Sequence, residues 1–397
     1  MGVMATTVVP LVPPERAART RSVARSGLLS DLDQRRPAFG YVTPNWFAAV
    51  MGTGIIAVAA HSLPWTPPGL AAVAVAFWML AVVLLVVLAA ATAAHWVGHP
   101  AVARGHATDP VMSHFYGAPP MAMMTVGAGT LLVGHQVLGD ALALSVDWVL
   151  WSVGTAAGLA AAVIVPYLVF VRRGRSADQA FGGWLMPVVP PMVSASTGAL
   201  LVPHASPGAG RTALLLACYT MFTLSLIASV VVLSRVIARL ARGDVGEPRL
   251  VPTLWIGLGP LGQSMTAVNL LGGVAHLVVP GSHVLLIFGV GYGTTVLAVA
   301  LAYAALATVV TARVAHDHLP FSLTWWSFTF PVGTVVTGLS ALALRTGFQP
   351  FRIGAVFLFL GLLGAWTTVA ARTARGAARG TLLSKPDPGL LPLGHKV

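Results

Sequence analysis

The sequence predicts an all-α membrane protein with ten transmembrane helices, which form five parallel helical hairpins with the odd-numbered helices inside. Three observations lead to this fold class. Hydrophobic residues make up 56% of the chain and charged residues 9%, whereas about a quarter of the residues of a soluble domain are charged. Ten apolar segments each reach the roughly 18 residues that identify a membrane-spanning helix. Proline and glycine are distributed unevenly between alternate segments.

The odd-numbered segments are rich in proline and glycine, and the even-numbered segments are not. The odd set holds nine prolines and sixteen glycines in 113 residues, against one proline and eight glycines in the 133 residues of the even set. In chain order, the odd segments are 44–61, 115–138, 181–202, 251–278 and 324–344, and the even segments are 70–95, 147–171, 211–238, 283–312 and 351–374.

This distribution predicts which helices lie inside. Proline removes a backbone hydrogen bond that hydrocarbon cannot replace. Helices broken in this way at membrane depth occur where protein or a water-filled path satisfies the freed backbone groups. We therefore expect the odd helices to surround a polar path and the even helices to enclose them. The competing interpretation is that the prolines are only packing kinks, since both residues are common in transmembrane helices.

Each odd helix and the even helix after it form one predicted hairpin. Every odd helix starts on the same side of the membrane, so the five hairpins are parallel and their N-termini meet on that side. Each N-terminus carries about half a positive charge and unsatisfied N–H groups. Such a ring of helix N-termini attracts anions.

The basic residues predict the orientation. Twenty of the 23 Lys and Arg lie in the two tails and in the loops on the same side of the membrane as the tails. The positive-inside rule then places both termini in the cytoplasm of a multi-pass protein of the cell membrane. This placement explains the net charge of +12 without nucleic acid as a partner, and contact with anionic membrane lipid is its second expected role.

The predicted organisation is a basic cytoplasmic tail over 1–43, one transmembrane domain over 44–374 and a cytoplasmic tail over 375–397. Residues 1–43 hold no apolar stretch of adequate length for a cleavable signal peptide, so none is expected.

Charge placement narrows the chemistry of the path. No Asp, Glu, Lys or Arg lies in an odd segment, and we place all eleven acidic residues in tails, loops or segment edges, Asp147 among the edges. Carriers driven by protons or sodium usually bury carboxylates, so this pattern favours a channel-like path. Hydroxyl and amide groups remain to replace part of an anion's hydration shell. The candidates for lining the anion path are Thr53, Thr125, Ser194, Thr197, Gln263, Ser264 and Thr329.

Signals for other chemistry are weak. Cys218 is the only cysteine and is expected to be a buried, inert thiol. His95 and His99 have the i, i+4 spacing that can share a metal ion, but no third ligand stands at a recognisable spacing. We expect no metal and no cofactor, and no nucleotide-binding motif is present. A membrane metalloenzyme that uses these histidines and a purely structural or sensory membrane protein are the alternatives from other classes.

Five motifs, one in each odd segment, carry a family resemblance. The most specific are NWF…MGTGI at the start and WWSFTFP near the end. In full they are TPNWFAAVMGTGIIA (43–57), HFYGAPPMAMMTVGAG (114–129), WLMPVVPPMVSASTGALL (184–201), PTLWIGLGPLGQS (252–264) and WWSFTFPVG (325–333). Over about residues 40–375 the chain resembles the tellurite-resistance/dicarboxylate transporter family, whose relatives include fungal malate permeases, sulfite efflux pumps and plant slow-type anion channels.

The resemblance implies a central pore lined by the odd helices, a homotrimer with one pore in each subunit, and a phenylalanine of the ninth helix that closes the pore. The matching residue is Phe330, directly before Pro331, and Phe328 is the alternative. An apolar ring held across the axis would block ions by dewetting. The prolines expected to kink the helices around the path are Pro119, Pro120, Pro187, Pro190, Pro191, Pro260 and Pro331.

The expected function is transport of a small anionic substrate, without enzymatic activity, through a channel-like central pore gated by phenylalanine. The substrate classes are a C4-dicarboxylate such as malate, a tellurite-type oxyanion or an inorganic anion. Within transport, the alternatives are a proton-coupled C4-dicarboxylate carrier and a sulfite exporter. The sequence leaves the anion open, because a neutral path selects by size and dehydration and not through a readable motif.

Overall fold

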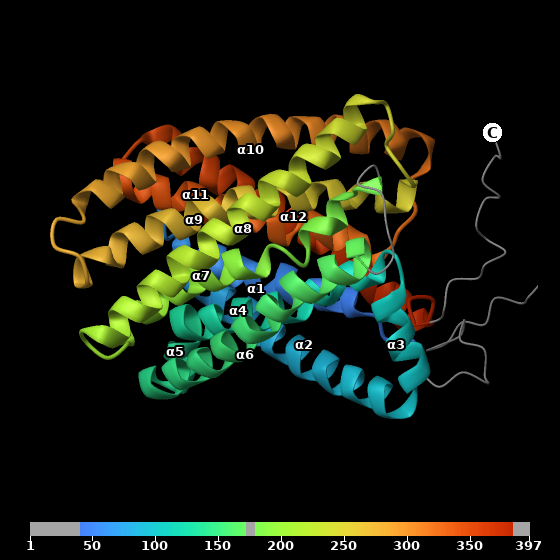
Figure 1. Ribbon diagram of the computed structural model, residues 1–397, viewed down its shortest axis with the longest axis horizontal. Helices are drawn as coiled ribbons and strands as arrows, with labels where there is room; N and C mark the ends of the chain where they lie inside the picture. Colours follow the sequence, from blue (N-terminus) through green and yellow to red (C-terminus); the bar gives the residue numbers. More distant parts are fainter. Residues whose placement is uncertain (1–39, 172–178, 384–397) are drawn as a thin grey trace, which may run out of the picture.

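The computed structural model describes residues 40–171 and 179–383, and all regular structure in this part of the chain is helical. The long helices lie side by side along the long axis of the molecule (Figure 1). Most of the two predicted tails, 1–39 and 384–397, lies outside the described residues. The all-α membrane class predicted from the sequence is confirmed at this level.

Seven helical stretches of the described chain are long and apolar enough to cross a membrane. They are Leu70–Gly98, Met112–Leu138, Asp140–Val169, Ala209–Ala241, His283–Asp317, Leu323–Thr346 and Gln349–Arg379. The three other predicted spans fall in the segments 44–62, 182–204 and 248–277, where the α-helical parts have only 16, 12 and 17 residues. These three segments are extended by short 3-10 helices.

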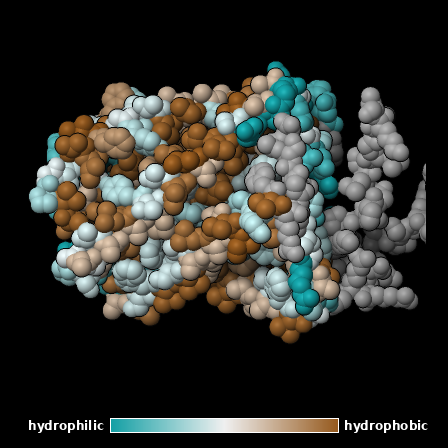
Figure 2. Space-filling view, in the orientation of Figure 1, coloured by the Kyte–Doolittle hydropathy of each residue, from teal (hydrophilic) through white to brown (hydrophobic). Residues whose placement is uncertain are grey.

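Five long helices carry most of the exposed apolar surface, and we call them the outer helices. They are α2 (Leu70–Gly98), α6 (Asp140–Pro166), α8 (Ala209–Ala241), α10 (His283–His318) and α12 (Gln349–Arg379). Their large apolar side chains are exposed, with Phe357 at 73% as an example. Figure 2 shows apolar residues spread along the flanks and hydrophilic residues gathered at the end where α3 (Pro100–Thr108) lies. This distribution suits helices whose flanks face lipid.

Five composite segments are buried between the outer helices, and we call them the inner segments. In order they are η1–α1 (Pro44–Trp46, Phe47–Ser62), η2–α4–η3–α5 (Met112–Gly117, Ala118–Gly129, Thr130–Gly134, His135–Leu138), η6–α7–η7 (Gly182–Leu185, Pro190–Leu201, Val202–His204), η8–α9–η9 (Pro248–Gly257, Leu258–Val274, Ala275–Leu277) and η10–α11 (Leu323–Phe328, Phe330–Thr346). Each begins with a 3-10 helix, whereas each outer helix begins directly as an α-helix.

The prolines of the inner segments explain the composite structure. Pro119, Pro190 and Pro331 lie in the first turn of α4, α7 and α11, directly after the 3-10 helix or turn that precedes each helix. Pro120, Pro191 and Pro260 also fall within first turns, and Pro187 lies in the turn between η6 and α7. An N–H in the first turn has no acceptor within the helix, so proline costs little there. The breaks are therefore junctions between 3-10 and α-helix, and not kinks inside continuous α-helices.

A glycine with positive φ stands in every connection from an inner segment to the outer helix that follows it. These glycines are Gly69, Gly139, Gly208, Gly281 and Gly347, with φ between 65° and 88°. Only glycine adopts this backbone conformation without steric cost. The connections are short, and each inner segment packs against its outer helix: α1 on α2, α4 on α6, α7 on α8, α9 on α10 and α11 on α12.

The inner segments also contact one another in a closed order. In the described chain α1 packs against α4, α4 against α7, α7 against α9, α9 against α11, and α11 against α1. Two glycines allow close approach within this ring. Gly52 of α1 faces Thr329 and Trp326, and Gly54 faces Thr125 of α4. These contacts give both glycines a role in helix packing.

Three histidines stack at the end of the molecule where α3 lies. The ring of His95 in α2 lies 5.3 Å from that of His106 in α3, at an interplanar angle of 19°, and 6.0 Å from that of His99. Tyr41 meets His106 edge to face at 5.0 Å. Burial of His106 and the neighbouring His95 lower the pKa of His106, against an opposing effect of Asp109.

We expect acid to destabilise the contact between α3 and α2. Because the folded-state pKa of His106 lies below its unfolded value of about 6.5, the unfolded chain binds the proton more tightly. The contribution of neutral His106 to the free energy of unfolding is complete above about pH 6.5. It is lost as the pH falls through the lowered folded-state pKa. The melting temperature of the detergent-solubilised protein should therefore fall between about pH 7.5 and about pH 5.5, and it should fall less for His106→Gln.

His316→Gln is the matched control, because it replaces a histidine whose side chain is 89% exposed. An identical pH slope for the wild-type protein and His106→Gln would contradict the expectation.

Candidate functional site

A cavity of about 230 Å³ lies within the ring of inner segments, and all of the inner segments contribute to its wall. The lining residues are Ile55, Val58, His61 and Ser62 of α1; Thr125, Ala128 and Leu132 of α4 and η3; Val193, Ser196, Thr197 and Leu200 of α7; Gln263, Thr266 and Leu270 of α9; and Phe330, Thr337, Ala341 and Leu344 of α11. Within each helix the lining positions recur every three or four residues, which is the spacing of one helix face. We call this the larger cavity.

A second cavity of about 30 Å³ continues the same axis toward the N-terminal ends of the inner segments. Its wall again includes residues of every inner segment: Ala48, Met51, Phe115, Met121, Met186, Val189, Ile256, Gly259, Leu323, Trp326, Ser327, Phe330 and Pro331. Most of these side chains are apolar. Its volume is about an eighth of that of the larger cavity, so this part of the axis is much narrower. We call it the smaller cavity.

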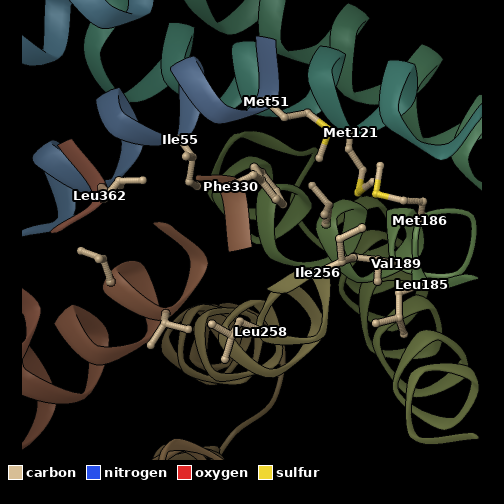
Figure 3. Close-up of a cluster of buried hydrophobic side chains, with 14 of the residues drawn as sticks. Met51, Ile55, Met121, Leu185, Met186, Val189, Ile256, Leu258, Phe330 and Leu362 are labelled. Atoms are coloured by element: carbon tan, nitrogen blue, oxygen red, sulfur yellow. The ribbon is translucent and has the colours of Figure 1, made fainter. Parts of the chain in front are cut away.

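Phe330 lies between the two cavities and is the one residue that lines both. Its ring is 5% exposed. Figure 3 shows it among Met51, Met121, Met186 and Ile256, which come from the four other inner segments. The phenyl ring therefore lies where the two cavities meet.

The junction between η10 and α11 positions this ring. η10 ends at Phe328, and α11 begins at Phe330 with Pro331 as its second residue. Proline favours a helix start at this point because its fixed φ suits the first turn. About one turn after Phe330, Gly333 lies against Ile55 of α1, where even a Cβ atom would meet the isoleucine side chain. This close approach brings α11 onto α1 beside Phe330.

Phe328, the alternative to Phe330 in the sequence, lies away from the axis. Its ring packs edge to face against Trp255 at 5.4 Å and against Trp325 at 5.6 Å. It lines a groove between α10 and α12 and neither of the axial cavities. The two phenylalanines thus differ in position, while the role of either one in gating stays a prediction.

Three of the polar residues predicted to line the path lie at the larger cavity. They are Thr125, Thr197 and Gln263. Three more side chains, Ser196, Thr266 and Thr337, complete a polar girdle next to Phe330. No carboxylate, lysine or arginine is among the residues that line either cavity.

Most hydroxyl protons of the girdle are directed to backbone carbonyls. Thr125 donates to the carbonyl oxygen of Met121 at 2.7 Å, and Thr197 donates to that of Val193 at 2.8 Å. Such hydroxyl groups present lone pairs to the cavity unless they give up the bond to the helix. Gln263 differs, because its amide carries two N–H donors and only one is directed to Ser196. Gln263 is therefore the strongest neutral donor available to an anion at the cavity wall.

Thr266 and Thr337 form the other polar contact of the girdle. Their hydroxyl oxygens lie 2.7 Å apart and join α9 to α11. Either hydroxyl can be the donor. This contact holds together the two helices that carry Gln263 and Phe330.

The four other predicted residues face neighbouring helices. Thr53 donates to Ala49 and accepts from Trp366 of α12. Ser194 donates to Pro190 and accepts from Thr155 of α6. Ser264 donates to Leu261, and Thr329 donates to Trp326. Each is one or two residues away from a residue that lines a cavity. The four residues therefore lie at the same depth as the cavities but on a different face of their helix. Their contribution to an anion path stays a prediction.

The sequence analysis missed Thr266, Thr337, His61 and Ser62, which the structure places at the larger cavity. A signal for the first two exists. Thr266 follows Gln263 by three residues and Thr337 follows Phe330 by seven, and both spacings return to the same helix face. His61 and Ser62 end α1, where no motif marks them.

The prediction that Asp147 lies at a segment edge is wrong. The helix begins earlier, at Asp140, so Asp147 lies about 10 Å inside α6. Its side chain is fully buried, and neither carboxylate oxygen has a hydrogen-bond partner in the described chain. It faces Gly127 of α4, where a Cβ atom would approach Oδ1 to 2.5 Å. Because Thr125 and Ala128 line the cavity, Asp147 lies behind α4 as seen from the axis.

The described residues contain no group of three or more His, Cys, Asp or Glu that could hold a metal ion. His95 stacks with His99 and with His106, and Cys218 is buried without a disulfide partner. His316 and Asp317 are exposed.

Comparisons with known proteins agree with the pattern of motifs. Residues 41–374 match the family profile described as Voltage-dependent anion channel. A sulfite efflux pump of Arthroderma otae is 25% identical over 346 residues, which covers 83% of this chain and 89% of that protein. An uncharacterized transporter of Methanocaldococcus jannaschii is 27% identical over 296 residues, which covers 74% of this chain and 81% of that protein.

Proposed function

The chain belongs to the Voltage-dependent anion channel family, and we propose that it moves small anions across the membrane between its inner segments, with Phe330 as the gate. Anion transport is the activity of the family, and a family of transporters agrees with the prediction that the chain is not an enzyme. The observation that carries the gating proposal is the position of Phe330, which separates two cavities on one axis.

The proposed architecture is ten membrane crossings, arranged as five parallel hairpins of one inner segment and one outer helix. The repeated positive-φ glycine between the two members of each pair supports it. The closed order of contacts among the inner segments supports a central path. The basic tails and loops support a cytoplasmic location for both termini in the cell membrane. A homotrimer with one path in each subunit is proposed on the resemblance alone.

In this proposal the structure represents the closed state. The smaller cavity is narrow and lined mostly by apolar side chains, and an apolar constriction excludes ions by dewetting. An anion passes when the Phe330 ring leaves the axis. A membrane potential that is negative inside then drives it outward by about 2.3 kcal/mol per charge per 100 mV.

Neutral donors, not fixed charges, would stabilise the anion in the larger cavity. Gln263 offers an amide N–H, and the hydroxyl groups of Ser196 and Thr197 can rotate toward an anion at the expense of their bonds to the helix. Such a path replaces part of the hydration shell without holding the ion tightly, as conduction requires. Sulfite is the first anion to test, because relatives named sulfite efflux pumps match most of the chain.

Replacing Phe330 with alanine should open the path. A constriction barrier lowered by about 1.4 kcal/mol raises flux about tenfold, and we expect an increase of at least about that size in anion current. The measurement is current across planar bilayers or flux from proteoliposomes with chloride, nitrate, sulfite and malate in turn, at equal and unequal pH.

Phe328→Ala is the matched control, because the same ring is removed from a position that contacts Trp255 and Trp325 outside the axis. Its current should stay at the wild-type level. Equal effects of the two substitutions, or no current from Phe330→Ala with correctly folded protein, would sink the gate proposal.

Replacing Gln263 with alanine should reduce anion flux through the open path. The loss of one donor is worth about 1 kcal/mol, so in the Phe330→Ala background we expect flux to fall about fivefold. Ser264→Ala is the control, because Ser264 bonds to Leu261 and lines neither cavity. If Gln263→Ala conducts as well as Ser264→Ala, the amide is not part of the anion path.

A proton-coupled carrier is the second candidate function, and Asp147 is the observation that favours it. A buried carboxylate without a hydrogen-bond partner is costly within a membrane helix and is often functional. Asp147→Asn keeps the shape and removes the titration. For a coupled carrier, malate uptake driven by a proton gradient should disappear in this variant while exchange at equal pH persists. For a channel, the variant should leave the anion current unchanged across the same gradient.

A further inference from the structure

One face of the outer helix α12 is turned toward the inner segments. The helix packs against both α1 and η10. Its buried residues recur every three to seven positions, which is the spacing of one helix face; they are Ala355, Phe359, Leu362, Val369 and Thr373. Trp366 is half-buried and continues the same face between Leu362 and Val369. Two members of this face carry polar groups, which are the indole N–H of Trp366 and the hydroxyl of Thr373.

Both polar groups bond to inner segments. Trp366 donates from Nε1 to Oγ1 of Thr53 in α1 at 3.0 Å. Seven residues later, which is about 10 Å along the helix, Thr373 accepts a bond at Oγ1 from Nε1 of Trp326 in η10 at 3.1 Å. Thr53 belongs to the motif MGTGI and Trp326 to the motif WWSFTFP. Helix α12 therefore connects the two most specific motifs of the sequence.

Trp326 lies next to the Phe330 ring. Both side chains line the smaller cavity, and both are buried. Thr329 is the single residue between the end of η10 and the start of α11, and its hydroxyl donates to the carbonyl oxygen of Trp326 at 2.7 Å. Gly52 of α1 lies so close that a Cβ atom there would overlap Thr329 and Trp326. Because η10 leads directly into α11, the position of η10 against α1 determines the direction of the Phe330 side chain.

A second contact between α12 and η10 lies directly beside the first. The guanidinium carbon of Arg372 is 4.7 Å from the ring centre of Trp325 and 6.0 Å from that of Phe321. A cation above an aromatic ring is attracted by the negative face of the ring. Adjacent residues of α12, Arg372 and Thr373, thus contact adjacent residues of η10, Trp325 and Trp326. Two neighbouring contacts fix the orientation of η10 as well as its distance from α12.

We propose that Trp366 and Thr373 are positioning residues that hold η10 against α1 and so keep the Phe330 ring in the axis. This inference rests on the proposed gate. In the open state the ring leaves the axis, η10 shifts relative to α1, and the bond from Trp326 to Thr373 is lost. The bond therefore stabilises the closed state alone, and its removal favours opening.

Threonines on two faces of α12 give a matched pair of substitutions. Thr373→Val keeps the shape of the side chain and removes the acceptor of the Trp326 N–H. Thr368→Val makes the same chemical change on the exposed face, where the hydroxyl donates to the carbonyl oxygen of Gly364 at 2.9 Å. Thr373→Ser keeps the acceptor oxygen. Trp366→Phe removes the N–H of the other bond and keeps an aromatic ring.

The experiment measures chloride current through the full-length protein in planar bilayers, for each variant alone and combined with Phe330→Ala. Thr373→Val alone should raise the current about fivefold, as expected when the closed state loses one hydrogen bond. Combined with Phe330→Ala it should add nothing, because no ring remains to be positioned. A purely structural role would instead lower the current in both backgrounds.

The other variants keep the result interpretable. Thr368→Val should match the parent protein in both backgrounds, and Thr373→Ser should remove most of the increase seen with Thr373→Val. Trp366→Phe should raise the current alone and add nothing to Phe330→Ala. It decides the test if Thr373→Val does not fold.

The outcomes separate this inference from the proposed gate. If Phe330→Ala raises the current but Thr373→Val does not, the positioning role is wrong and the gate stands. The same increase by Thr373→Val in both backgrounds would also overturn the positioning role, because the substitution would then act independently of the ring. If Phe330→Ala leaves the current unchanged, the gate itself is wrong, and the positioning role is wrong with it.

Discussion

The structure depends on one constraint: backbone N–H and C=O groups in hydrocarbon have no water to bond. Proline would break this rule inside an α-helix, yet the inner segments contain eleven prolines. Most of them lie in first turns, where the missing N–H would have had no partner within the helix. The 3-10 turns that precede these helices are enclosed by other inner segments and by the outer helices. The proline-poor outer helices can therefore face lipid, and the proline-rich segments cannot.

The same constraint determines what the path can offer an anion. The hydroxyl groups of Thr125 and Thr197 already donate their protons to carbonyl oxygens of their own helices. Such hydroxyl groups therefore have no free proton to donate to an anion unless they give up these bonds. Gln263 retains a donor because an amide has two N–H groups. A path of this kind binds anions weakly at any one point, which suits conduction better than storage. If Phe330 is the gate, as proposed, its ring and not the strength of anion binding is the main control on flux.

The sequence predicted the features that depend on composition and spacing. The all-α class and the inner position of the proline-rich segments follow from patterns over many residues, whereas the choice of Phe330 came from the family resemblance. The sequence did not predict which residues of each helix line the cavities, because this depends on the rotation of the helix about its axis. Thr53, Ser194, Ser264 and Thr329 were chosen by residue type, and each faces a neighbouring helix because 100° of rotation separates one residue from the next. Asp147 was misplaced because α6 begins at Asp140, before the apolar run that marked its start in the sequence.

Helix α4 lies between two candidate functional features, the larger cavity and Asp147. One face of this helix carries Thr125 and Ala128 to the larger cavity, and the opposite face carries Gly127 to Asp147. Directly after these residues the helix widens into the π-helix η3 over Thr130–Gly134, a form that occurs mainly as local distortions at functional sites. A change of charge at Asp147 would act on the path through α4, because no other inner segment separates the carboxylate from the cavity at this point. The chain can therefore combine a neutral anion path with a titratable group, provided that the group stays behind the wall and not in it.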